Sequence, residues 1–317
     1  MGNSIYDRYA KNLNEIRAKY NLAIGTNDST EKLLNGYLCP ITLDYFPGPN
    51  FRELSREHVP QEKLGGSIIC LTNKKWNNDF GSIDNYAVER VKEMAKNKLE
   101  NKINSTGGFR NGMTGRFELT PGDKPKITFI SKACKEDNPK FMAFLESMKN
   151  QGEFKINLKP RGQLTRLAKL AYLKNAYLIL FNYFGYGVIF GKKGFYKIFS
   201  EIRRQLRNPR QEMLESHNFI MEMDSENKFE GVYLIEKGKE KTLGVFYNLL
   251  GEISLSICVI FPSLSQKGDP IFNWNKVYTE VQLTKINKPA NFLSFESVLG
   301  GINAEFVPSD YLSETIN

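Results

Sequence analysis

The hydrophobic pattern at the start of the chain predicts a helix followed by two strands. Residues 3–20 place apolar side chains three and four positions apart, the spacing of an amphipathic helix, at Ile5, Tyr9, Leu13, Ile16 and Tyr20. A short second helix, capped by Asp28 or Ser29, is expected to end near Gly36. Short β-branched and apolar runs then favour two strands, over 51–59 and 67–72.

A longer helix is expected after the second strand. Between residues 77 and 104 the apolar side chains recur at helical spacing, at Ile83, Val88, Val91, Met94, Ala95 and Leu99. The stretch "LCPITLDYFPGPNF" before the strands contains three prolines and one glycine, which indicates a turn-rich knuckle. The order knuckle, strand, strand, helix is therefore expected for residues 38–104.

The remainder of the chain predicts a mixture of helices and strands. Strands are expected at 115–120, 126–131 and 153–158, and helices from 138 onward, at 165–184 and at 195–208. Four runs from Gly231 onward favour a meander of strands, at 231–236, 242–250, 253–261 and 276–284. The sequence thus predicts an α+β protein with a carboxyl-terminal antiparallel β-meander.

A domain boundary is expected near residue 105. The stretch "NSTGGFRNGMTG", residues 104–115, has four glycines among small polar residues, which is typical of a linker. The length of 317 residues also favours about two domains. We therefore predict one domain over 1–105 and a larger α+β domain over 106–317.

Composition places the chain among globular proteins. It is 41% hydrophobic and 25% charged, and the amino terminus lacks the apolar run of a secretion signal, so a cytoplasmic location is the default expectation. The most apolar run, residues 167–190, contains Lys169, Lys174, Asn175 and Asn182. A buried core helix is therefore expected there, and no contact with a membrane is expected.

The four cysteines do not indicate a disulfide framework. Cys39, Cys70, Cys134 and Cys258 are few and widely spaced for a chain of this size. All four are expected to be reduced.

Charge is distributed unevenly along the chain. Residues 106–210 carry 21 Lys and Arg against 7 Asp and Glu, whereas the whole chain has a net charge of +9. A basic region of this kind suits a phosphate-binding surface, because each neutralised phosphate releases counterions. A solvated basic face would produce the same count, so charge alone leaves both interpretations open.

Residues 55–82, "SREHVPQEKLGGSIICLTNKKWNNDFGS", carry the candidate chemistry. Glu57 directly precedes His58, one of two histidines in the chain, and Asn77 lies at the start of the predicted helix. A histidine can take a proton from water near neutral pH, while carboxylate and amide oxygens can hold a hard cation such as Mg²⁺. This combination can support metal-assisted phosphodiester cleavage.

The same residues resemble the HNH endonuclease family. The ββα-metal motif of that family contains a C-x-x-C pair, an acid-His step, two glycines, a second C-x-x-C pair and an Asn or His after it. In this chain "CPIT", "EHVP", "LGG", "NKKW" and "NNDFGS" stand in that order with matching spacing. The resemblance covers roughly residues 38–90 and implies an amino-terminal HNH-like ββα-metal module within residues 1–105.

The resemblance implies a role for each matching residue. His58 would be the general base, and Asn78 would position metal or substrate. One Mg²⁺ or Mn²⁺ ion would be held by Glu57 and Asn77, with Asp84 about two turns along the helix as a further ligand. Gly65 and Gly66 would shape the turn between the strands and let the backbone approach phosphate.

The zinc-binding knuckle of the family is degenerate here. Of its four cysteine positions only Cys39 remains, with Thr42, Asn73 and Trp76 at the other three. A structural zinc needs four soft or imidazole ligands, so zinc is not expected. Trp76 is expected to fill the knuckle with apolar bulk. Phe80 stands where the family often has a lysine, which puts one phosphate contact in doubt.

Basic residues outside the motif complete the predicted nucleic-acid surface. Contacts to the phosphate backbone of a nucleic acid are expected from eight side chains: Lys74, Lys75, Lys192, Lys193, Lys197, Arg203, Arg204 and Arg207. His217 is interpreted as a surface residue.

Three functions follow as hypotheses. The first is a metal-dependent endonuclease that hydrolyses phosphodiester bonds in DNA, with double-stranded DNA as the first choice of substrate and RNA left open, and with a role in phage defence implied by the family. The second is a catalytically inactive HNH-like protein that binds nucleic acid. The third is a protein-interaction factor. A homo-oligomer and a regulatory protein partner are both left open.

Overall fold

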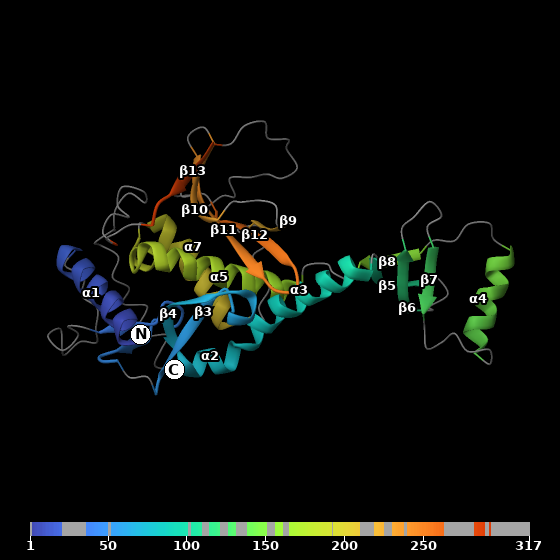
Figure 1. Cartoon of the computed structure of the whole chain (residues 1–317), viewed down its shortest axis with the longest axis horizontal. Helices are drawn as coiled ribbons and strands as arrows, with labels where there is room; N and C mark the ends of the chain where they lie inside the picture. The colour runs from blue at the N-terminus through green and yellow to red at the C-terminus, as the bar shows by residue number, and fades with distance from the viewer. Residues whose placement is uncertain are drawn as a thin grey trace. The chain divides into compact units, whose positions relative to one another are not determined.

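The computed structural model describes residues 2–20, 36–49, 52–100, 103–109, 114–120, 126–130, 138–150, 156–160, 165–191, 193–209, 219–224, 230–237, 240–262, 282–288 and 292. The chain divides into two compact units, residues 1–88 with 166–317 and residues 89–165 (Figure 1). The boundary predicted near residue 105 falls inside the second unit. The predicted short helix near residues 28–36 and His217 lie outside the described residues.

The amino-terminal part of the first unit has the predicted order of elements. It contains α1 (Gly2–Tyr20), β1 (Tyr37–Leu38), β2 (Tyr45–Phe46), β3 (Leu54–Val59), the short 3-10 helix η1 (Glu62–Leu64), β4 (Ser67–Asn73) and α2 (Lys74–Phe80). Strands β3 and β4 pair antiparallel, as do β1 and β2 at the knuckle. The single helix predicted over 77–104 is instead two helices, because α2 ends at Phe80 and α3 (Ser82–Glu100) begins after Gly81.

The turn between β3 and β4 requires both of its glycines. Gly65 has a φ of 82°, in the left-handed region that side chains rarely adopt. At Gly66 a Cβ atom would lie 1.4 Å from the carbonyl oxygen of Pro60. The predicted shaping of this turn by Gly65 and Gly66 is confirmed.

The carboxyl-terminal part of the first unit contains three helices and an antiparallel sheet. The helices are α5 (Arg166–Phe184), α6 (Gly187–Phe190) and α7 (Lys193–Arg207). The strands are β9 (Phe219–Asp224), β10 (Gly231–Lys237), β11 (Glu240–Leu250), β12 (Ser254–Ile260) and β13 (Gln282–Ile286), in the spatial order β13-β10-β11-β12-β9. The α+β class with a carboxyl-terminal antiparallel sheet is therefore confirmed.

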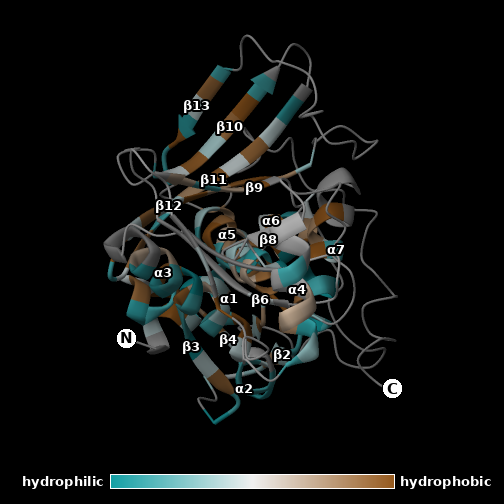
Figure 2. Cartoon of the chain, turned by 90° about the vertical axis from the view of Figure 1, so that its right-hand side faces the viewer, coloured by the Kyte–Doolittle hydropathy of each residue, from teal (hydrophilic) through white to brown (hydrophobic). Residues whose placement is uncertain are grey.

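Helix α5 is the centre of the first unit. It contacts β3 and β4 as well as strands β9–β12 of the five-stranded sheet, and hydrophobic residues, in brown, are visible along its ribbon (Figure 2). Thirteen of its residues are buried, including Lys174 and Asn175. The predicted core helix is thus confirmed. Among the helices that the structure describes, none is both long and apolar enough to cross a membrane.

Tyrosine hydroxyls attach the knuckle to the core. The hydroxyl of Tyr177 on α5 donates to the carbonyl oxygen of Pro40 at 2.5 Å, and that of Tyr186 donates to the carbonyl oxygen of Leu38 at 2.8 Å. Tyr37 donates in the same way to the carbonyl oxygen of Leu71 on β4 at 2.6 Å. These buried hydrogen bonds fix the knuckle, the β3–β4 pair and α5 as one body.

The second unit contains the strands expected near the predicted linker. It has β5 (Ile103–Phe109), β6 (Thr114–Thr120), β7 (Lys126–Ile130), α4 (Pro139–Asn150) and β8 (Ile156–Pro160), with the strands in the antiparallel order β7-β6-β5-β8. Strand β5 pairs on both sides, with β6 and with β8. The interpretation of residues 104–115 as a linker is therefore wrong for 104–109 and 114–115, which belong to β5 and β6, while 110–113 lie outside the described residues.

Candidate functional site

One face of the β3–β4 pair carries polar side chains. Side chains alternate between the two faces of a strand, so Ser55 and Glu57 lie on one face of β3. Their partners across the pair are Thr72 and Cys70 of β4. The Thr72 hydroxyl donates to Glu57 Oε2 at 3.1 Å, and Thr72 Oγ1 lies 3.2 Å from Ser55 Oγ. The carboxylate of Glu57 is therefore held in place by its own strand pair.

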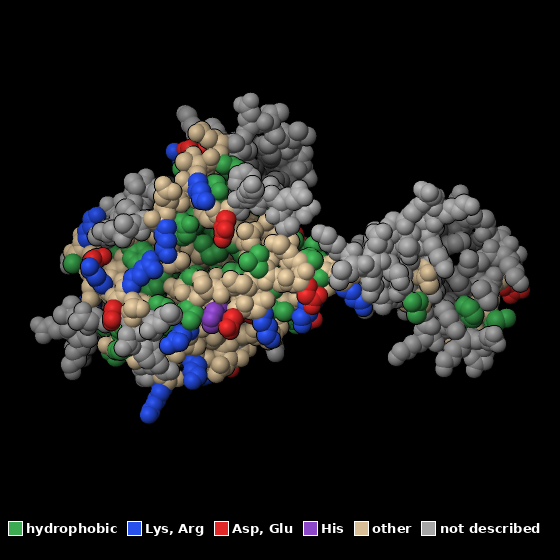
Figure 3. Space-filling view, in the orientation of Figure 1, with side chains coloured by type: hydrophobic (Ala, Val, Ile, Leu, Met, Phe, Trp, Pro, Cys, Tyr) green, Lys and Arg blue, Asp and Glu red, His purple; other side chains and the backbone are tan. Residues whose placement is uncertain are grey.

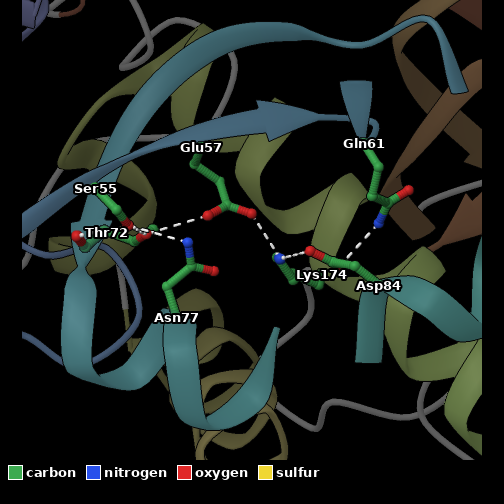
Figure 4. A network of polar contacts seen from close by, with 7 residues as sticks. All are labelled: Ser55, Glu57, Gln61, Thr72, Asn77, Asp84 and Lys174. Carbon is green, nitrogen blue, oxygen red and sulfur yellow. Dashed lines mark hydrogen bonds and ion pairs between the residues drawn. The ribbon is translucent and has the colours of Figure 1, made fainter. Parts of the chain in front are cut away.

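A lysine from α5 reaches into this polar face. Lys174 Nζ lies 2.6 Å from Glu57 Oε1 and 2.7 Å from Asp84 Oδ2 of α3 (Figure 4). The side chains of Lys174 and Glu57 are only 1% and 3% exposed. The other oxygen of Asp84, Oδ1, accepts a hydrogen bond from Gln61 Nε2 at 2.9 Å. One ammonium group thus joins two carboxylates that are 27 residues apart in sequence.

Two residues of α2 border the same cluster. Asn77 Nδ2 donates to Ser55 Oγ at 3.0 Å, which connects Asn77 through Ser55 and Thr72 to Glu57 (Figure 4). Trp76 is buried, and Lys174 Nζ lies 5.6 Å from the centre of its ring. A cation at that distance is attracted by the negative face of an aromatic ring. The ring therefore adds to the surroundings that favour a positive charge at this point.

Burial and charge shift the proton affinities of the pair. Burial raises the pKa of Glu57, the Lys174 ammonium opposes this rise, and the negative charge of Asp84 adds to it. Burial alone would lower the pKa of Lys174, but the two carboxylates raise it above its ordinary value. Lys174 is therefore charged at neutral pH, and one positive charge is shared between two acids.

Three of the residues predicted to bind metal come together in this network. Glu57, Asn77 and Asp84 are linked by hydrogen bonds and ion pairs. The arrangement does not fit a divalent ion held between Glu57 and Asp84, because an ammonium group already lies within hydrogen-bonding distance of both carboxylates. Within the part of the chain that the structure describes, no three His, Cys, Asp or Glu side chains gather as a metal site.

The predicted general base lies outside the network. His58 follows Glu57 on β3, at the step where the pairing register with β4 shifts, and no hydrogen bond or ion pair among the described residues links it to the network. It is partly exposed, and a histidine is visible at the surface beside acidic and basic side chains (Figure 3). Among the described residues its ring makes no hydrogen bond. The structure thus brings Glu57, Asn77 and Asp84 together but does not bring His58 to them.

The knuckle is held by hydrogen bonds at the positions where the family has zinc ligands. Cys39 Sγ accepts hydrogen bonds from the backbone N–H groups of Thr42 and Asn73, at 3.5 and 3.3 Å. The Asp44 carboxylate accepts from the Thr42 hydroxyl at 2.6 Å and from the Asn73 side-chain amide. Asn73 Oδ1 also caps α2 by accepting from the N–H of Trp76 at 3.1 Å. Cys39, Cys70 and Cys258 are buried free thiols, as expected, while Cys134 lies outside the described residues.

A cleft opens beside the knuckle and the start of α2. Its volume is about 590 Å³, and its lining includes Arg52, Lys74, Lys75, Asn78 and Asp79. Lys74, Lys75 and Asn78 are exposed. Asn78 therefore faces this cleft, whereas Asn77 belongs to the buried network.

The basic surface predicted around α7 needs one correction. Arg203 is buried, and its Nη1 lies 3.5 Å from the Tyr177 hydroxyl, so Arg203 is a core residue and the prediction that it contacts nucleic acid is wrong. Arg204 is exposed, but its guanidinium pairs with Glu201 at 2.6 Å. Arg207 is partly exposed at the end of α7. Lys193 and Lys197 also lie on α7, although the description of the structure does not extend to their side chains, and Lys192 lies outside the described residues.

Lys174 is the site residue that sequence reasoning missed. In the sequence pattern it indicates only that a membrane span is unfavourable. A lysine in an otherwise apolar, buried helix nevertheless indicates a buried ion pair, because a buried charge requires a partner. That signal does not identify the partners, since Glu57 lies 117 residues and Asp84 lies 90 residues from Lys174 in sequence.

Comparisons of the chain with protein-family models, with curated protein sequences and with solved structures found no match.

Proposed function

We propose that this protein binds nucleic acid through an HNH-like ββα unit in which a lysine ammonium replaces the catalytic metal ion. The observation that carries the proposal is the position of Lys174 Nζ, 2.6 Å from Glu57 and 2.7 Å from Asp84. Two of the residues that the family would use to bind metal are thereby bound by an ammonium group of the chain itself. The proposal is the non-catalytic hypothesis of the three drawn from the sequence.

Local geometry supports the HNH-like interpretation of β3, β4 and α2. The acid Glu57 comes from β3 and the amide Asn77 from the middle of α2, which begins at Lys74 and not at Asn77 as predicted, and both join one network. At the knuckle, Cys39 Sγ accepts two backbone N–H bonds, and Trp76 is buried as expected. Hydrogen bonds and apolar burial account for the knuckle's geometry without a zinc ion.

Charge supports nucleic acid as the partner. Lys74 and Lys75 are exposed at the beginning of α2. The second unit, residues 89–165, contains 16 Lys and Arg against 9 Asp and Glu, and so carries most of the chain's net charge of +9. Basic side chains in these places can neutralise phosphates, and double-stranded DNA is the partner that the HNH resemblance favours.

Salt-dependent binding tests this proposal. We expect a fluorescently labelled DNA duplex to bind with an affinity that falls steeply between about 50 and 200 mM salt. The variant Lys74→Ala/Lys75→Ala should reduce the slope of log K against log salt by about 1.8, if both lysines contact phosphates. Lys11→Ala, which changes an exposed lysine of α1, is the matched control. Absence of binding to DNA and RNA at low salt would contradict the proposal and favour a protein-interaction factor.

A metal-dependent endonuclease is the second candidate. The partly exposed His58, whose ring is not engaged by the described residues, is the observation that favours it. In this hypothesis His58 acts as the general base, and Glu57, Asn77 and Asp84 hold one Mg²⁺ or Mn²⁺ ion after Lys174 has moved away. Plasmid nicking that requires metal and is lost in His58→Ala would establish this function in place of the first.

A further inference from the structure

The charges around Lys174 do not balance within the cluster. Two carboxylates, Glu57 and Asp84, face one ammonium group, and among the three side chains only Asp84, at 18% exposed, has appreciable contact with solvent. Burial of an unpaired charge is costly, whereas a divalent cation would neutralise both acids. The two carboxylates therefore match the charge of a divalent cation, whereas the Lys174 ammonium supplies only one positive charge.

The neutral groups of the cluster also suit a cation. The Asn77 nitrogen is fixed on Ser55 by its hydrogen bond, so the amide oxygen lies on the side facing Lys174 (Figure 4). Glu57 is oriented by Thr72 and Asp84 by Gln61, which keeps one oxygen of each carboxylate directed at Nζ. Supporting hydrogen bonds of this kind orient metal ligands in metalloproteins.

We infer that Glu57, Asp84 and Asn77 form the oxygen shell of a cation site that this chain fills with its own Lys174, and that removal of the ammonium converts the cluster into a divalent-metal site. The inference rests on the proposed function, because it assumes that Lys174 occupies the position at which a ββα unit of the HNH type binds its metal ion. Its consequence is that Lys174 is a positioning residue for the strand pair and α3, and that it excludes metal from the intact protein.

The ion distances are compatible with this exchange. Lys174 Nζ lies 2.6 and 2.7 Å from its two carboxylate oxygens, whereas divalent ions take oxygen ligands at about 2.0–2.6 Å. Small shifts of two side chains would close that difference. Truncation at position 174 would supply the space, since Lys174 fills it from α5.

Metal binding by Lys174→Ala tests the inference. Purified full-length protein is titrated with Mn²⁺, and binding is followed by the loss of the free Mn²⁺ signal in electron paramagnetic resonance and by the thermal midpoint Tm. We expect no specific binding by the wild-type protein, one ion per chain for Lys174→Ala, and a Tm of the variant that rises with Mn²⁺ by several degrees. The double variant Lys174→Ala/Glu57→Gln should lose this response, and Lys169→Ala, a lysine change on the same helix, should not gain it.

A second variant covers the case in which Lys174→Ala does not fold without metal. The amide of Lys174→Gln can still donate to the carboxylates but leaves both charges unneutralised, so Mn²⁺ should raise its Tm as well. Recovery of the native circular-dichroism spectrum by Mn²⁺ is the corresponding readout for an unfolded Lys174→Ala. No Mn²⁺ response in either variant would overturn the inference, as would specific binding of Mn²⁺ by the wild-type cluster. Each result is independent of DNA binding. Failure of the metal-binding test would therefore not contradict the proposed function, which the salt-dependent DNA-binding experiment tests separately.

Discussion

At the scale of residues, Lys174 determines what the candidate site can do. Its ammonium group is buried and is bound by Glu57 and Asp84. A buried ion pair is weak evidence of net stabilisation, but removing one partner leaves an uncompensated charge in the interior. Lys174 therefore has a structural role that can be separated from any role in binding nucleic acid.

Substitution of Lys174 by methionine is predicted to be strongly destabilising. We expect Lys174→Met to lower the free energy of unfolding by about 3–5 kcal/mol, because Glu57 then remains buried without its counter-charge. In the double variant Lys174→Met/Glu57→Met the loss should be smaller than in the single variant. Urea unfolding of the two proteins measures the difference. The single variant Glu57→Met completes the cycle, and a loss in the double variant equal to the sum of the two single losses would show that the two side chains are not coupled.

The raised pKa of Glu57 predicts a pH dependence of stability. Burial raises this pKa above the ordinary value of 4.5, so between the two values the folded protein binds the proton more tightly than the unfolded chain does. The contribution of Glu57 to stability should therefore decrease as pH rises from about 4.5 through the folded pKa. Urea unfolding of the wild type and of Glu57→Gln across this range should show the decrease in the wild type only. A constant difference between the two proteins would contradict the assigned shift.

The sequence predicted part of this site. Glu57, Asn77 and Asp84 are close in sequence and follow a motif, so a local pattern was sufficient to group them. It could not show that Glu57 joins the network and His58 does not, since the family motif carries both residues as one step. It could not connect Lys174 to either acid, because that contact depends on how α5 packs against β3 and α3.

At the scale of elements, the knuckle and α2 form a unit stabilised by side-chain hydrogen bonds. Asn73 caps α2 through Oδ1 and binds Asp44 through Nδ2. Cys39 Sγ accepts two backbone N–H groups in the same place. Both interactions satisfy donors that would otherwise be unpaired next to a buried turn.

Substitution of Asn73 is predicted to weaken this element. We expect Asn73→Ala to lower the free energy of unfolding by about 1–2 kcal/mol, through loss of the helix cap and of the bond to Asp44. Asn73→Asp retains the capping oxygen but places a second carboxylate next to Asp44, so it should not restore stability. Thermal unfolding compares the three proteins. If Asn73→Ala unfolds at the same temperature as the wild type, the Asn73 cap does not contribute to stability.

Metal chelation is predicted to leave the knuckle unchanged. Hydrogen bonds occupy the positions of the family's zinc ligands, so EDTA should not alter Tm, and the purified protein should contain no zinc by elemental analysis. In a protein with a structural zinc, chelation would unfold the domain. A fall in Tm on chelation, reversed by zinc, would contradict this account of the knuckle.

Elements with regular hydrophobic periodicity were predicted well, whereas strand β5, with two adjacent glycines, was not. Helix α5 and strands β10 to β12 have strong patterns, and the structure has them within a few residues of the expected bounds. Strand β5 contains Gly107 and Gly108 and was interpreted as a linker. It forms a strand because β6 and β8 pair with it on both sides, which is tertiary context that overrides local preference.

At the scale of the whole molecule, the ββα unit is not a separable domain. Strands β3 and β4 pack on α5, and the first compact unit joins residues 1–88 to residues 166–317. The boundary predicted near residue 105 rests on local composition, which does not reveal that the chain returns to the first unit after residue 165. A fragment ending at residue 105 would lack Lys174 as well as Tyr177 and Tyr186, whose hydroxyls bind the knuckle.

Truncation tests this organisation. We expect the fragment 1–105 to be unfolded by circular dichroism, because Glu57 and the buried face of β3 and β4 lose their partners. A chain in which residues 89–165 are replaced by a flexible Gly/Ser linker should retain a cooperative unfolding transition, since it keeps the first unit whole. A folded 1–105 fragment would show that the amino-terminal module is independent of α5.

The central claim is that the ββα unit binds nucleic acid with an internal ammonium in place of a metal ion. The most direct measurement follows supercoiled plasmid DNA on gels after incubation with the wild-type protein in Mg²⁺, in Mn²⁺ and in EDTA. The account predicts retardation of the plasmid in all three conditions, without conversion to nicked or linear forms. Nicking that requires Mg²⁺ or Mn²⁺ and disappears in His58→Ala would contradict it.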